Sequence, residues 1–259
     1  MRVRYLLFVL AFSAGIVGLS FAAGPRLLAE GKLTVGLMGT YPPYNFLNAS
    51  HQVDGFDADI AKEIARRLGV QVQFVPTEWS AMVEGLLKGK FDAVISQMTI
   101  TDDRKKVMDF SQPYMRNPVN VIVRADNTRI TGLADLRGKR VGVGLGTNDE
   151  AYLRNVANPK YGPFTIATYD DVITSLKDLS DGRIDATINN IYAITPVVNQ
   201  NLYRIKAVGE PIKVDFAGVA VQKNHAELLA AIDGALTDMK KDRTYKSIFR
   251  KWFNADPTS

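Results

Sequence analysis

The stretch that decides the fold covers residues 55–75 and reads GFDADIAKEIARRLGVQVQFV. Within it Phe56, Ile60, Ile64 and Leu68 recur every four residues, which predicts one apolar stripe along a helix. Gly69 follows as a residue that commonly ends a helix, and residues 70–75 alternate as a strand does. Because residues 33–37 form another apolar, β-rich run before it, the stretch predicts a βαβ unit and a parallel sheet.

Working outward, the same alternation continues through most of the chain. We expect a helix over 79–87 and a strand over 91–95. The second half repeats the plan, with strands expected over 139–143, 165–169 and 185–188 and helices over 149–156 and 172–179. The sequence therefore predicts an α/β fold of two lobes, each a mainly parallel sheet flanked by helices.

The two lobes are expected to share the chain unequally. We assign residues 23–115 to the first lobe and 116–213 to the second. Residues 214–259, with a strand over 216–221 and two helices over 226–253, are expected to return to the first lobe. The chain then crosses twice between lobes, near 116–120 and 211–214, which is the arrangement of a hinge.

The first 22 residues have the layout of a secretory signal peptide. Arg2 and Arg4 precede an apolar run over 5–19, and Ser20-Phe21-Ala22 offers a cleavage site after Ala22, with Ala23 as a second choice. A membrane anchor is the alternative, but the run is shorter than the roughly 20 residues that span a bilayer. Since the chain has no cysteine, we expect no disulfide and no lipoprotein anchor, and hence a free periplasmic protein.

Charge and composition exclude several other classes. The net charge of +5 falls to +3 without Arg2 and Arg4, too little to indicate nucleic-acid binding. His51 and His225 have no metal-ligand spacing, so neither a metal nor a cofactor is expected. Gly142, Gly144 and Gly146 lie between a strand and a helix, but the third glycine comes one residue too early for a dinucleotide site.

Polar and aromatic residues follow the predicted strands. In open α/β sheets ligands bind beyond the carboxyl ends of the strands, although each residue taken alone has an equally ordinary structural explanation, as a core aromatic or a surface charge. Together they indicate a small polar organic ligand with a carboxylate. The candidates are Tyr41, Trp79, Ser96, Gln97, Thr99, Arg104, Thr147, Asn148 and Asn190.

These residues lie in motifs that resemble the polar amino-acid-binding proteins of ABC importers, the family 3 solute-binding proteins. The resemblance covers essentially the whole mature chain. Its strongest motif is Gly55-Phe56-Asp57-Ala58-Asp59, although Ala58 is smaller than the aliphatic residue usual there. Residues 92–95, 99–104, 109–114 and 136–147 carry the others. The resemblance implies a hinge-bending periplasmic-binding-protein fold of type II and a receptor that hands its ligand to a membrane permease, expected here as a monomer.

The resemblance also implies roles for single residues. Arg104 would bind the α-carboxylate of the ligand, with N–H donors from the backbone around Thr99 and Thr147. Tyr41 and Trp79 would enclose the ligand between their rings. On closure the second lobe would add Thr147, Asn148 and Asn190.

Asn190 departs from the family pattern, which usually has an aspartate there to bind the α-ammonium. An amide accepts a hydrogen bond but lacks the charge. Either the ammonium finds another partner, such as Asp149 or Glu150, or the ligand is not a standard α-amino acid. Gln97, Asn189 and Tyr44 favour a neutral polar side chain on the ligand.

Two other functions fit the same scaffold. Cyclohexadienyl (arogenate) dehydratases resemble this family, and Thr77-Glu78-Trp79 and Gly146-Thr147-Asn148 are similar to their segments. Such an enzyme needs a general acid in the cleft, and residues 189–193 contain no carboxylate. The other function is a sensory module for a membrane-bound kinase or chemoreceptor, although we expect no attached domain and hence an importer as the simpler partner.

Overall fold

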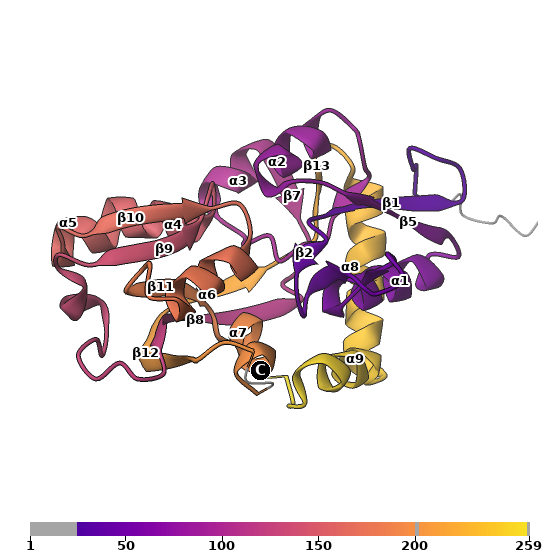
Figure 1. Ribbon diagram of the computed structural model, residues 1–259. Coiled ribbons are helices and arrows are strands. Elements are labelled where there is room, and N and C mark those ends of the chain that lie inside the picture. Colours follow the sequence, from indigo (N-terminus) through magenta and orange to yellow (C-terminus); the bar gives the residue numbers. More distant parts are fainter. Residues whose placement is uncertain (1–24, 200–201, 258–259) are drawn as a thin grey trace, which may run out of the picture.

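The computed structural model describes residues 25–199 and 202–257, which form two five-stranded sheets and a small third one (Figure 1). The first sheet contains, in spatial order, β5 (Gln71–Pro76), β1 (Lys32–Leu37), β6 (Ala93–Val94), β13 (Ala220–Gln222) and β7 (Met108–Phe110). The second contains β10 (Thr165–Tyr169), β9 (Arg140–Gly144), β11 (Ala186–Asn190), β8 (Met115–Arg124) and β12 (Ile205–Ala217). The third contains β2 (Thr40–Tyr41), β3 (Asn45–Leu47) and β4 (Val53–Asp54).

Helices flank both large sheets. They are α1 (Phe56–Arg67), α2 (Trp79–Leu87), α3 (Asp102–Val107), α4 (Asn148–Tyr152), α5 (Asn158–Tyr161), α6 (Val172–Ser180), α7 (Ile191–Asn199), α8 (Ala226–Lys241) and α9 (Thr244–Phe253), with a 3₁₀ turn at Leu133–Leu136 and a π turn at Leu153–Ala157. Within the described residues none of the helices has the length and apolar character needed to span a membrane.

The predicted α/β architecture is confirmed, and the parallel strand pairs come from the βαβ units. β1 runs parallel to β5 and β6, and β9 runs parallel to β10 and β11. The pairs that involve β13, β7, β8 and β12 are antiparallel. Each large sheet therefore has two parallel and two antiparallel strand pairs, so it is mixed and not mainly parallel as expected, and its parallel pairs lie where the sequence predicted them.

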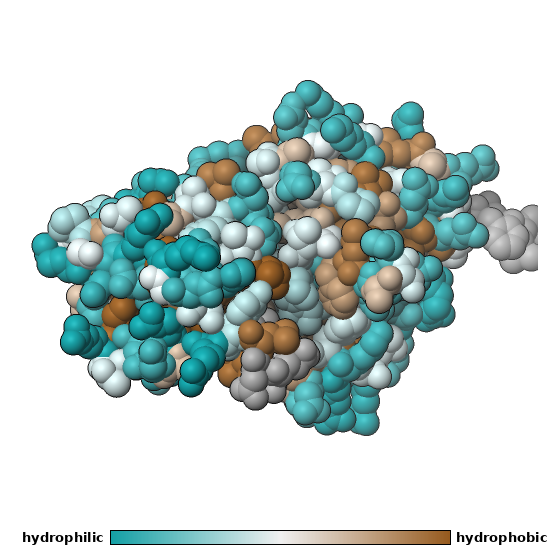
Figure 2. All heavy atoms as spheres, in the orientation of Figure 1, coloured by the Kyte–Doolittle hydropathy of each residue, from teal (hydrophilic) through white to brown (hydrophobic). Residues whose placement is uncertain are grey.

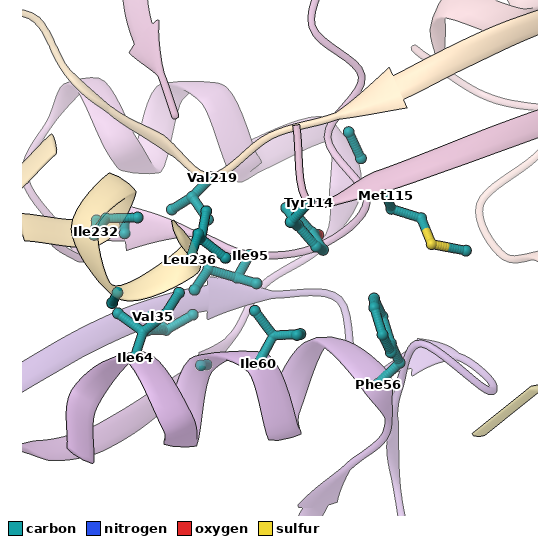
Figure 3. Close-up of a cluster of buried hydrophobic side chains, with 14 of the residues drawn as sticks. Val35, Phe56, Ile60, Ile64, Ile95, Tyr114, Met115, Val219, Ile232 and Leu236 are labelled. Atoms are coloured by element: carbon teal, nitrogen blue, oxygen red, sulfur yellow. The ribbon is translucent and has the colours of Figure 1, made fainter. Parts of the chain in front are cut away.

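Helix α1 forms the centre of the first core. Phe56, Ile60 and Ile64 are fully buried, and Figure 3 shows Ile60 and Ile64 pointing toward Val35 of β1. Ile232 of α8 belongs to the same cluster, so the last part of the chain packs against the first. At roughly 1.5–3 kcal/mol for each large apolar side chain buried, this stripe accounts for much of the stability of α1.

An aromatic cluster extends this core to α7, the helix that follows strand β11 of the second sheet. Phe56 packs against Phe253 of α9, with ring centroids 5.2 Å apart. Tyr192 of α7 packs edge-on against Phe249 at 5.6 Å and lies 5.1 Å from Phe253. Because α7 leads out of the second sheet, these rings join the two halves of the molecule.

Strands β8 and β12 carry the chain between the two sheets. They pair antiparallel from Met115 with Ala217 to Arg124 with Ile205, with a shift in register between Val208 and Lys213. Figure 1 shows them side by side, reaching from the second sheet toward the first.

Two predicted elements differ from those observed. The strand expected over 216–221 is divided, because β12 ends at Ala217 in the second sheet and β13 begins at Ala220 in the first. The helix expected over 149–156 continues to Tyr161 through the π turn, whose Leu153 and Ala157 are buried in the core of the second sheet.

The surface in the orientation of Figure 2 is mostly hydrophilic, with hydrophobic residues scattered over it. The signal peptide expected over residues 1–22 lies outside the described residues.

Candidate functional site

A cleft lies between the two large sheets, and both contribute to its walls. It contains about 840 Å³ of empty space, part of which is open to solvent. Eight of the nine side chains predicted for the site line it, namely Tyr41, Trp79, Ser96, Gln97, Thr99, Thr147, Asn148 and Asn190. The ninth, Arg104, is half-buried beside Trp79 and Thr99.

Arg104 is positioned by the start of α3. The hydroxyl of Thr101 accepts the backbone N–H of Arg104 at 3.2 Å and caps the helix. The guanidinium donates from Nη1 to the carbonyl of Thr99 at 2.9 Å and lies 5.3 Å from the centre of the Trp79 ring.

The charge of Arg104 is not neutralised by an ion pair. Over residues 25–199 and 202–257 no carboxylate lies within 4 Å of its guanidinium. Burial lowers the pKa of Arg104, and Asp149 and Asp215 oppose that shift. The ordinary value is so high that the group stays charged. Its remaining N–H donors can therefore pair with a carboxylate brought by a ligand.

Trp79 and Ser96 fix the wall of the first lobe. Trp79 opens α2, and its Nε1 donates to the carbonyl of Gly146 across the cleft at 3.2 Å. The hydroxyl of Ser96 accepts the backbone N–H of Met38 at 3.2 Å, which holds the end of β1.

Gln97 lines the cleft, but its amide already forms hydrogen bonds with other residues of the protein. Its Nε2 donates to Asp57 Oδ1 at 2.6 Å, and its Oε1 accepts from Asn117 Nδ2 at 2.9 Å. Its φ of 52° places it in the left-handed region. Tyr114 and Asn45 also donate to Asp57, at 3.0 and 2.7 Å, so the Asp of the α1 motif organises the floor of the cleft.

Asp57 leads to a prediction about pH. Burial raises the pKa of Asp57 from 3.8 to about 7, against the hydrogen bonds from Asn45 and Gln97, which lower it. Between these two pH values the folded state keeps a proton that the unfolded state has released, so the free energy of unfolding should fall as pH rises. We expect urea unfolding at about pH 5 and about pH 8 to differ less in Asp57→Asn than in the wild type. An equal pH dependence in both proteins would contradict this origin.

Asn190 is the last residue of β11 and joins the two lobes. Its Oδ1 accepts the hydroxyl of Tyr44 at 2.6 Å and the backbone N–H of Ala193 at 2.9 Å, and its Nδ2 donates to Tyr41 Oη at 2.7 Å. The hydroxyl of Tyr41 donates in turn to Asn189 Oδ1 at 2.8 Å. Both ends of the Asn190 amide therefore hold tyrosines of the first lobe, and an aspartate could not donate to Tyr41.

The second lobe presents a helix start at the cleft. The hydroxyl of Thr147 accepts the N–H of Glu150 at 3.1 Å and donates to the carbonyl of Gly144 at 2.7 Å, which caps α4. Thr147 therefore uses its hydroxyl within its own turn. Asn148 donates from Nδ2 to Asp215 Oδ2 at 2.7 Å.

Two carboxylates share a lysine beside this helix start. Lys213 Nζ lies 2.7 Å from Asp149 Oδ1 and 2.7 Å from Asp215 Oδ2, and both acids line the cleft. Burial raises the pKa of Asp149, and Lys213 opposes that shift. Burial also opposes protonation of Lys213, but the two acids outweigh it and raise its pKa.

The sequence reasoning missed Lys213 and Asp215. Residues two apart in a strand face the same side of the sheet, and the second chain crossing between the lobes was expected near 211–214. The spacing of Lys213 and Asp215 at that crossing was therefore the one signal that could have placed both side chains at the cleft. Of the two acids considered for an ammonium, Asp149 lines the cleft. Glu150 instead accepts the N–H of Gly146 at 2.7 Å and pairs with Arg154 at 2.8 Å.

The expectation that Gln97, Asn189 and Tyr44 favour a neutral ligand side chain stays a prediction, and of the three Gln97 and Asn189 line the cleft. Tyr44 is fully buried, and its hydroxyl and the Gln97 amide are both used within the protein. Four aspartates also line the cleft, Asp149, Asp170, Asp171 and Asp215, and the carboxylate of Asp171 accepts the N–H and hydroxyl of Thr174 at the start of α6.

The comparison with known proteins decides what kind of molecule carries this cleft. Residues 33–255 match the family model of bacterial extracellular solute-binding proteins, family 3. The chain belongs to this family. It is therefore an extracytoplasmic solute-binding protein with the two-lobed fold of that family, as its sequence motifs predicted.

Named relatives of this solute-binding protein bind amino acids. The L-cystine-binding protein TcyJ of Escherichia coli is 39% identical over 90% of this chain and 86% of its own length. An ancestral arginine-binding protein bound to arginine has a TM-score of 0.81 and 40% identity, covering 86% of this chain and 98% of its own. The ancestral amino-acid-binding protein AncCDT-1, a precursor of cyclohexadienyl dehydratase, has a TM-score of 0.80 and 36% identity, covering 86% and 96%.

Proposed function

We propose that this solute-binding protein captures an amino acid, L-cystine or a basic amino acid being the first candidates, and delivers it to the membrane permease of an ABC importer. The observation that carries the proposal is Arg104, a charged guanidinium without an acid partner among the described residues, at the edge of a cleft between two lobes. A ligand carboxylate supplies that partner. The names of the cystine- and arginine-binding relatives support the ligand class.

Asp149, Asp170 and Asp215, which line the cleft, favour a ligand that carries more than one positive group. Arginine has a guanidinium beyond its α-ammonium, and cystine has a second ammonium. Either group can interact with the acids that line the second lobe.

Binding is proposed to proceed by closure of two bodies. Residues 23–115 with 214–259 form the first lobe and residues 116–213 the second. The ligand contacts Arg104, Thr99, Tyr41 and Trp79 on the first lobe, and the second lobe adds its groups around Thr147 and Asn148. Strands β8 and β12 supply the hinge because they carry the chain between the sheets.

The cellular location of the protein is inferred from the signal peptide expected over residues 1–22. We propose cleavage after Ala22, release into the periplasm without a lipid anchor, and a monomeric receptor. The permease recognises the closed pair of lobes.

A thermal-shift screen of the mature protein tests the proposal. It compares the twenty amino acids and L-cystine with decarboxylated and deaminated analogues. A ligand that binds only the folded state raises the melting temperature by mass action. We expect a shift with an amino acid and none with its decarboxylated analogue. No shift with any amino acid would refute the proposal.

The dehydratase remains the second candidate because Asp149 lines the cleft and burial raises its pKa, as a general acid requires. Its ion pair with Lys213 opposes that rise, which favours the receptor. Turnover of prephenate or arogenate by the purified protein, lost in Asp149→Asn, would establish the enzyme instead.

A further inference from the structure

Asn190 has no free hydrogen-bonding group of the kind an ammonium needs. An ammonium requires an acceptor, and the one acceptor atom of the side chain, Oδ1, already binds Tyr44 and the N–H of Ala193. The other polar atom of the side chain, Nδ2, is a hydrogen-bond donor and cannot accept a hydrogen bond from an ammonium. Asn190, which aligns with the usual ammonium partner of the family, therefore uses its amide to join the second lobe to Tyr41 and Tyr44 of the first lobe.

The anionic charge of the cleft lies on Asp149 and Asp215. Lys213 contacts both acids, so the group of three carries one net negative charge. Arg104, with no carboxylate within 4 Å in the described ranges, carries one net positive charge on the opposite lobe. A zwitterionic ligand between them complements both charges.

Asp149 has one carboxylate oxygen that the described residues leave free. Lys213 and Asn148 approach its Oδ1, whereas no hydrogen bond from a described residue reaches its Oδ2. Asp215 has the same arrangement, because Lys213 and Asn148 both bind its Oδ2, so the effect on the first lobe is what distinguishes Asp149. Asp149 acts on Tyr41 of the first lobe. Burial is the main cause that raises the pKa of Tyr41, and the negative charge of Asp149 is the next.

We infer that the α-ammonium of the ligand binds to Asp149, oriented by Lys213 and Asp215, in place of Asn190. The inference rests on the proposed function, because it requires the ligand to be an amino acid. The ammonium donates to Oδ2 of Asp149 while Lys213 holds Oδ1. The ligand class is accordingly α-amino acids with both groups free.

Titration calorimetry of Asp149→Asn with paired probes tests this inference. The probes are L-cystine and its deaminated analogue dithiodipropionate, and L-arginine and its deaminated analogue guanidinovalerate. We expect Asp149→Asn to weaken binding of the amino acids by about 10- to 100-fold, the loss of one charge-assisted hydrogen bond. Binding of the deaminated probes should change by less than about threefold. Lys213 keeps Asp215 in this variant, so the fold should be retained.

Two further variants sharpen the result. Glu150→Gln is the matched control, since this neighbouring acid is not among the residues that line the cleft and its carboxylate contacts Gly146 and Arg154, and it should bind all probes as the wild type does. Asn190→Asp should not increase the preference for the amino acid over its deaminated analogue. An unchanged preference in Asp149→Asn would show that Asp149 does not bind the ammonium, and a tenfold gain in Asn190→Asp would place the ammonium at residue 190; either result would overturn the inference. If the wild type bound neither amino acid, the proposed function would fail first.

Discussion

Replacing Arg104 by Ala is expected to weaken binding of the amino-acid ligand by a hundredfold to several thousandfold. Removing one partner of a buried ion pair costs about 3–5 kcal/mol, because the other charge is left without compensation. In the closed cleft the ligand carboxylate would face the carbonyl of Thr99 and the ring of Trp79, which supply no positive charge. Calorimetric titration with the ligand found by the thermal-shift screen measures the loss.

Two variants control this result. Lys106→Ala removes a cation of the same helix, but Lys106 is exposed and pairs with Asp103 at 2.6 Å, so its affinity should equal that of the wild type. Arg104→Lys keeps the charge without the two-pronged geometry and should recover part of the affinity. Wild-type affinity in Arg104→Ala would show that the carboxylate binds elsewhere.

The second large effect is expected on stability, from Gly55→Ala. Gly55 precedes α1 with φ 122° and ψ 175°, a region that is essentially restricted to glycine. A Cβ there would lie 2.3 Å from the carbonyl oxygen of Tyr44, which also accepts the N–H of Asp57 at 2.7 Å. Since backbone strain and the clash add, we expect the free energy of unfolding to fall by about 3 kcal/mol or more.

Gly69→Ala is the matched comparison, at the other end of the same helix. Gly69 also has a positive φ, 72°, but no atom lies within 4 Å of an added Cβ. Only backbone strain remains, at about 1–2 kcal/mol. Urea unfolding followed by circular dichroism measures both variants. Equal losses in the two would mean that the contact with Tyr44 does not govern the start of α1.

Most of the fold could be predicted from the sequence because apolar periodicity records which face of each element is buried. The period of four from Phe56 to Ile64 located α1, and the helix expected over 79–87 has those bounds in the structure. The passage from β12 to β13 was not predictable in this way. In the sequence, residues 216–221 have the pattern of one strand. Ala217 pairs with Met115 in the second sheet and Ala220 pairs with Val94 in the first, and this change of sheet leaves no local signal in the sequence.

The site was predictable in position but less so in detail. Strand ends and family motifs brought eight predicted residues to one cleft. They did not reveal that Gln97 and Thr147 use their side chains within the protein, or that Asn190 binds two tyrosines. The assignment of Asn190 depends on contacts across the lobes, between residues up to 149 positions apart, whereas Gln97 contacts Asp57 within the first lobe and Thr147 bonds within its own turn. Lys213 and Asp215 belong to the same class, because only the fold brings them to Asp149.

The most direct test of the account is calorimetric titration of the mature wild-type protein with an amino acid and its two truncated analogues. For cystine these are dithiodipropionate and cystamine, and for arginine guanidinovalerate and agmatine. We predict that the amino acid binds at least about tenfold more tightly than either analogue, because Arg104 needs the carboxylate and the acids of the second lobe need the ammonium. Equal affinity for cystamine or agmatine, which lack the carboxylate, would contradict it.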